Sequence, residues 1–96
     1  MRVLLIDDIR NMTADRVARN FTEGIEALKS EKWDLLLLDH DLSSYVDGKE
    51  KTGYDVMCFL EENPQYLPGK IKLVTSNPVG RYNMQVVIDK LYSEEK

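Results

Sequence analysis

The sequence lacks the features of a secreted or membrane-inserted protein. Cys58 is the only cysteine, so no internal disulfide can form, and a reduced cytoplasmic setting is the simpler expectation. Long apolar runs are also missing. The first apolar run, residues 3–6, is too short for a signal peptide or a membrane span, and Asp7 and Asp8 interrupt it. We therefore expect a cytoplasmic protein with no membrane contact.

The sequence also lacks an excess of positive charge. Thirteen Lys and Arg residues stand against seventeen Asp and Glu residues, which gives a net charge of −4. Bulk nucleic-acid binding is not expected, because its affinity depends on neutralising many phosphates, although a single phosphate can still be bound locally. With 96 residues and 43% hydrophobic content, the chain is predicted to form one globular domain over 1–96.

The apolar pattern predicts an α/β protein. Strands are predicted at 2–6, 16–21, 33–38 and 71–75, and helices at 23–31, at 54–63 and from Pro78 onward. Thr22, Thr52 and Asn77 are the expected N-caps. The unbroken leucines of 35–38 indicate a strand buried on both faces, with helices on each side. The expected fold is a small three-layer parallel sheet.

Two connections in this scheme are unusual. Only seven residues, 9–15, separate Asp8 from Arg16, whereas a parallel crossover normally needs a dozen or more. Either the first helix has shrunk to a turn or the second strand is a marginal edge strand. The polar stretch 42–52 holds the turn signal Asp47-Gly48 and no apolar period, so it is expected to be a functional or mobile loop.

Polar residues follow three of the predicted strands, where a parallel sheet places its ligands. The residues are Asp7 and Asp8; Asp39, His40 and Asp41; and Thr75, Ser76 and Asn77. If the first and third strands are neighbours, Asp7, Asp8 and Asp39 converge and would resist ionisation together unless a cation lay between them. Oxygen ligands of this kind suit Mg²⁺. The alternative is that each acid only solvates a strand end.

The start of the last helix has the residues of a phosphate site. Thr75 and Ser76 carry hydroxyls, and Asn77, Gly80 and Arg81 bring a helix N-terminus, a permissive glycine and a guanidinium within one turn. Arg10 is a second candidate contact for an anion. An ordinary capped helix with surface arginines would show the same residues.

His40 follows Asp39 directly, so on an extended strand it points to the face opposite Asp39 and Asp41. It could act as a general acid or base near neutral pH. It could equally pack under a neighbouring helix or bond a backbone carbonyl. The sequence leaves these alternatives open.

These residues resemble the receiver domains of two-component signalling. The resemblance implies a flavodoxin-like strand order 2-1-3-4, Mg²⁺ held by Asp7, Asp8 and Asp39, phosphorylation of Asp39, and a metal contact from the Asp41 main chain. The hydroxyl of Thr75 or Ser76 would contact the phosphoryl group. The chain departs from receivers in its degenerate first helix, and it ends before their fifth strand, its lysine and the fifth helix.

A closer resemblance covers nearly the whole chain. The words DDIR, LDHDL, TGYDV and SNPVGRYNM, in this order, resemble the cyclic-phosphate processing receiver-like domain family. This implies a metal-dependent protein that binds or hydrolyses a phosphate ester, such as a cyclic phosphate on a nucleotide or RNA end. Asp39 and His40 would be its catalytic candidates, and whether it is a phosphoesterase stays open. The alternatives are a shortened phosphoacceptor receiver and a non-catalytic domain that sequesters a ligand or docks on a protein.

Overall fold

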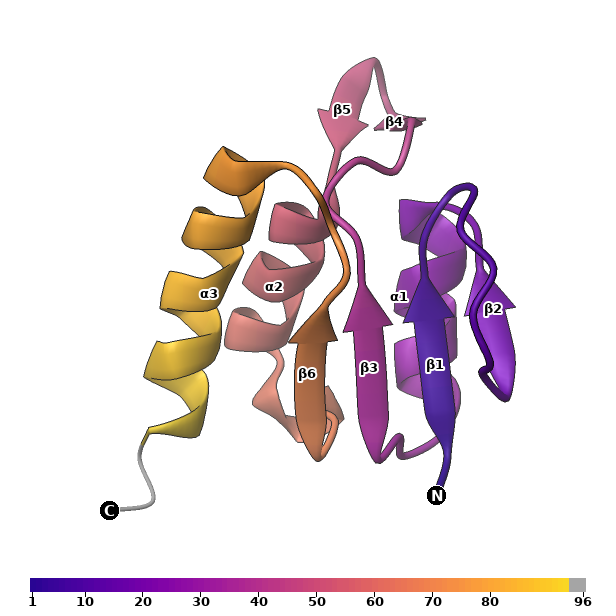
Figure 1. Cartoon of the computed structure of the whole chain (residues 1–96), viewed down its shortest axis with the longest axis vertical. Coiled ribbons are helices and arrows are strands. Elements are labelled where there is room, and N and C mark those ends of the chain that lie inside the picture. Colours follow the sequence, from indigo (N-terminus) through magenta and orange to yellow (C-terminus); the bar gives the residue numbers. More distant parts are fainter. Residues whose placement is uncertain (94–96) are drawn as a thin grey trace.

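A four-stranded parallel sheet forms the centre of the structure, a computed structural model that describes residues 1–93. Its strands, in spatial order, are β2 (Arg16–Ala18), β1 (Val3–Ile6), β3 (Leu35–Leu38) and β6 (Lys70–Leu73) (Figure 1). The helices are α1 (Phe21–Ser30), α2 (Gly53–Glu62) and α3 (Pro78–Tyr92), with a short 3₁₀ turn, η1 (Pro64–Tyr66). The expected α/β class, the strand order and the truncated receiver-like form are confirmed.

The three helices pack on one face of the sheet. Leu4, Leu36 and Ile71 point to this face and join buried residues of α1, α2 and α3 in one core. Leu5 and Leu37 point the other way, because side chains alternate along a strand, and they are buried outside that core. The expectation of helices on both faces is therefore wrong. The segment 9–15 contains no helix and passes in front of β2 in Figure 1, on the side opposite the helices.

The short connection after β1 shows both predicted features, a missing first helix and a marginal edge strand. No helix forms between Asp8 and Arg16, and β2 is a three-residue edge strand that pairs with Leu4–Ile6. Asp15 fixes the return of the chain, since its carboxylate accepts from the Val3 N–H at 2.7 Å and its own N–H donates to the Val3 carbonyl at 2.8 Å.

The predicted strand 16–21 was too long at its end. Asn20, not Thr22, is the N-cap of α1, and its Oδ1 accepts from the Glu23 N–H at 2.9 Å. Phe21 is therefore the first residue of a helix that packs its apolar side against the core. The N-caps Thr52 and Asn77 of the other two helices are confirmed.

The segment 42–52 holds a small antiparallel hairpin that was not predicted. β4 (Ser44–Val46) and β5 (Lys49–Lys51) pair around Asp47 and Gly48. Both turn residues have positive φ, 54° and 78°, as a two-residue Asp-Gly hairpin turn requires. The strands were missed because Lys-Glu-Lys shows no apolar alternation.

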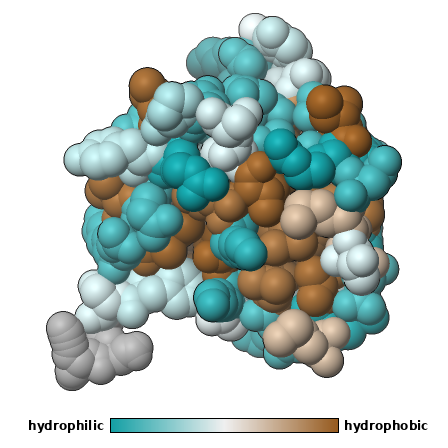
Figure 2. Space-filling model, viewed as in Figure 1, coloured by the Kyte–Doolittle hydropathy of each residue, from teal (hydrophilic) through white to brown (hydrophobic). Residues whose placement is uncertain are grey.

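The sheet face opposite the helices carries an apolar surface. Figure 2 shows hydrophobic side chains gathered over the middle of this face, with hydrophilic ones around them. Val3 and Leu35 are partly exposed there. Within residues 1–93, no helix combines the length and the apolar character that crossing a membrane requires.

Candidate functional site

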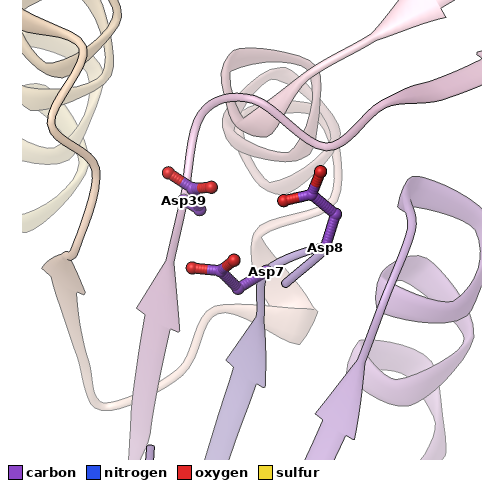
Figure 3. Close-up of side chains that lie close together, drawn as sticks. All are labelled: Asp7, Asp8 and Asp39. Atoms are coloured by element: carbon purple, nitrogen blue, oxygen red, sulfur yellow. The ribbon is translucent and has the colours of Figure 1, made fainter. Parts of the chain in front are cut away.

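Three carboxylates converge at the carboxyl end of the sheet. Asp7 and Asp8 follow β1, Asp39 follows β3, and these strands are adjacent and parallel, so the residues after them meet. One carboxylate oxygen from each lies within 4.8 Å of the others (Figure 3). Asp7 is fully buried and Asp39 nearly so. The expected convergence of these three residues, called here the acidic cluster, is confirmed.

The cluster carries more negative charge than its surroundings compensate. Burial raises the pKa of Asp39, and the nearby Asp7 carboxylate raises it further. The His40 backbone N–H, the Thr75 hydroxyl and Arg10 act in the opposite direction without cancelling the increase. A positive charge at this place would therefore be stabilised.

Arg10 supplies one such charge. Its Nη1 lies 2.9 Å from Asp7 Oδ2 and 3.9 Å from Asp39 Oδ1. The other oxygen of Asp7 accepts from the backbone N–H groups of Ile9 and Arg10 at 3.1 and 2.9 Å. The chain thus turns tightly around the Asp7 carboxylate, and this turn brings the Arg10 guanidinium to the cluster.

Arg19 and Ser43 also shape the site, and sequence reasoning missed both. Arg19 Nη1 donates to the carbonyls of Arg10 and Asp7 at 2.8 and 3.2 Å, and its Nη2 donates to Asn11 Oδ1 at 2.6 Å. Ser43 Oγ donates to Asp8 Oδ2 at 2.9 Å. Neither residue lies in one of the quoted motifs, and only the folded chain brings them to the cluster.

The predicted phosphate residues do not all face the cluster. Thr75 is buried against Asp39, and its Oγ1 accepts from the Asn77 N–H at 3.0 Å. Asn77 caps α3 by accepting from the Gly80 N–H at 3.0 Å. Arg81 donates from Nη2 to the carbonyls of Leu73 and Thr75, both at 3.3 Å, so its guanidinium holds the end of β6. Ser76 is exposed.

His40 lies against the first turn of α3. A Cβ on Gly80 would collide with the imidazole ring, so this glycine is what allows the contact. His40 Nδ1 is 2.9 Å from Asp41 Oδ1, and Asn77 Nδ2 is 3.4 Å from the same ring nitrogen. The Asp41 side chain turns toward His40 because β3 ends at Leu38, where strict alternation stops. The main-chain metal contact expected of Asp41 stays a prediction.

The acidic cluster fits a hard divalent cation. All its donors are carboxylate oxygens, and they come from two adjacent strand ends. Burial first and repulsion from Asp7 second raise the pKa of Asp39, and a cation would offset both. Mg²⁺ binds such oxygens and usually keeps several of its waters. Arg10 is the only basic residue paired with the cluster among residues 1–93, and its contact with Asp39 is a long one.

A family model described as the cyclic-phosphate processing receiver domain matches residues 2–90. The chain belongs to this family. Neither the curated proteins nor the solved structures contain a significant match to the chain. This cyclic-phosphate processing receiver domain has an acidic cluster like the metal site of receivers, at the same end of a parallel sheet.

Proposed function

We propose that this domain is a metal-dependent phosphate-site protein that binds a phosphate ester and hydrolyses it, with a cyclic phosphate of a nucleotide or RNA end as the substrate class. The observation that carries the proposal is the convergence of Asp7, Asp8 and Asp39 within 4.8 Å in a domain of this family. Burial of Asp7 and Asp39 strengthens their interaction with any cation, because the local dielectric constant is low.

Each group of residues has a separate task in this proposal. The acidic cluster would hold the cation, with the Asp41 carbonyl as a further ligand. The phosphate contacts would come from Arg10 and Thr75, which contact the cluster carboxylates, and from the exposed Ser76. Asn77, Gly80 and Arg81 position the start of α3 and the end of β6 beside them. A bound cation of this kind polarises a phosphoryl oxygen and lowers the pKa of its water. His40 is the candidate base: with Nδ1–H donating to the Asp41 carboxylate, Nε2 is left to accept a proton.

The first test is binding of Mg²⁺ to the Asp39→Asn protein. Calorimetric titration should show a loss of affinity of about tenfold or more, because one of three carboxylates is neutralised. Asp47→Asn is the matched control, since Asp47 lies in the β4–β5 turn and its change removes the same charge. Unchanged Mg²⁺ affinity in Asp39→Asn would contradict the assignment.

The second test is turnover of adenosine 2′,3′-cyclic phosphate with MgCl₂. In hydrolysis, the water oxygen bonds to phosphorus, one of the two ester P–O bonds breaks, and the ribose oxygen that leaves takes a proton. ³¹P NMR separates the cyclic ester from the monoester. Recovery of unaltered ligand after demonstrated binding would replace hydrolysis with ligand sequestration.

One contact favours a second candidate function, that of a phosphoacceptor. The Thr75 hydroxyl contacts the nearly buried Asp39, which is the pair that the receiver resemblance assigns to the phosphoryl group. Incubation with a small phosphodonor and Mg²⁺ should then add the mass of one phosphoryl group, and the addition should be absent in Asp39→Asn. An unchanged intact mass would remove this candidate.

A further inference from the structure

A surface cavity of about 470 Å³, wide open to solvent, lies beside the acidic cluster. It is lined by the start of α1 and the entry to β4, through Asn20, Thr22, Glu23, Ser43, Ser44 and Tyr45. Ser43 belongs to both places, because it lines the cavity while its Oγ donates to Asp8 Oδ2 at 2.9 Å. A ligand whose phosphate lies at the cluster would therefore have this cavity directly beside it.

The walls of the cavity suit a neutral group better than a second phosphate. None of the six lining residues is basic, and Glu23 adds a negative charge to that of the neighbouring Asp8. Side-chain hydrogen-bonding groups remain available: the Thr22 hydroxyl, and the Asn20 amide nitrogen, whose partner oxygen caps α1. Groups of this kind match sugar hydroxyls and the polar edge of a base.

Tyr45 provides an aromatic surface at this cavity. It is 67% exposed although it is a large aromatic residue, and it projects from the short strand β4. Every nucleobase has a π-face that can stack on such a ring, and this stacking does not depend on sequence. The volume also lies within the range of small-molecule sites, which is roughly 300 to 1,000 Å³.

We propose that this cavity is the nucleoside subsite of the domain, in which Tyr45 stacks on the base of a nucleoside monophosphate whose phosphate lies at the acidic cluster. The inference rests on the proposed function and narrows its substrate class. It assigns the nucleoside part of that substrate to named residues, and it predicts that nucleoside phosphates bind more tightly than base-free phosphate esters.

The test compares two ligands with the same five-membered cyclic phosphate, one with a base and one without. Adenosine 2′,3′-cyclic phosphate and glycerol 1,2-cyclic phosphate are titrated calorimetrically, with MgCl₂, into the wild type, Tyr45→Ala, Tyr45→Phe and Tyr82→Ala. Tyr82 is the matched control, because it is an equally exposed tyrosine on α3, outside the cavity lining.

We expect Tyr45→Ala to weaken adenosine binding about tenfold or more, as loss of one base-stacking contact does, and to leave glycerol binding unchanged. Tyr45→Phe keeps the ring and should retain affinity, and Tyr82→Ala should match the wild type. Equal affinity of the wild type for both ligands, or equal weakening of both by Tyr45→Ala, would overturn the nucleoside subsite alone. Failure of the wild type to bind either ester would overturn the proposed function with it.

Discussion

Replacing Arg10 with glutamine should make the acidic cluster bind Mg²⁺ more tightly. The Arg10 guanidinium lies 2.9 Å from Asp7 Oδ2 and 3.9 Å from Asp39 Oδ1, so it neutralises the oxygens that a metal ion would use. A divalent cation must compete with this charge. Arg10→Gln removes the competitor and keeps a polar side chain that can still hydrogen-bond.

The size of the effect follows from the distances. A divalent ion bound to these oxygens would lie within about 5 Å of the guanidinium, where their repulsion is about 1.7 kcal/mol even at the dielectric constant of water. The local dielectric constant at the buried carboxylates is lower than that of water, but the Arg10 side chain is 39% exposed and can move away from a bound ion into solvent, which keeps the repulsion near this low value. An increase in Mg²⁺ affinity of about tenfold is expected.

Calorimetric titration measures the Mg²⁺ affinity of the variant, and thermal unfolding measures its stability with and without Mg²⁺. Without Mg²⁺, Arg10→Gln should unfold at a lower temperature than the wild type, because the acidic cluster loses its partner. Added Mg²⁺ should then raise the unfolding temperature of Arg10→Gln by more than it raises that of the wild type. Arg16→Gln removes the same charge from an exposed contact with Ser30 and is the control. An Mg²⁺ affinity of Arg10→Gln equal to or below that of the wild type would refute the reasoning.

Two further predictions concern packing and pH. Gly80→Ala should lower the free energy of unfolding by about 1 to 3 kcal/mol, because the new Cβ collides with His40. In urea titrations, His40→Ala should restore part of this loss, and strictly additive effects would contradict the contact. Burial raises the pKa of Tyr92 from 10.0 to about 12, so its contribution to stability is complete below pH 10 and is lost as the pH rises through 12. Tyr92→Phe should lack this decline, although it loses the 2.6 Å bond to the Pro68 carbonyl, and parallel stability curves between pH 9 and 12 would contradict the prediction.

The sheet was predictable because its strands have strong local signals. Leu35–Leu38 are all apolar, and Asp7 and Asp39 mark the ends of two such runs. Strand order followed from the receiver resemblance, and the convergence of the acids followed from the order. The prediction of helices on the second face was wrong for a reason that periodicity does not reveal. Leu5 and Leu37 are buried, but the residues that cover them do not have to belong to a helix.

The details of the site were less predictable, because they depend on groups that act through the backbone. Arg19 contacts two carbonyl oxygens, and carbonyls have no sequence signature. For His40 the sequence left several alternatives open, and the structure shows one of them, packing against a helix, through Gly80 of α3. Contacts of this type are decided by where loops close, and loop closure depends on the whole fold.

The short connection after β1 links the main departure of the fold to the chemistry of the site. Residues 9–15 are too few for a crossover helix, so the chain turns at once around the Asp7 carboxylate through two backbone N–H groups. This turn directs Arg10 at the cluster, and Arg19, the residue directly after β2, holds the turn in place. The absence of a helix after β1 and the position of the Arg10 guanidinium at the acidic cluster therefore have the same structural cause.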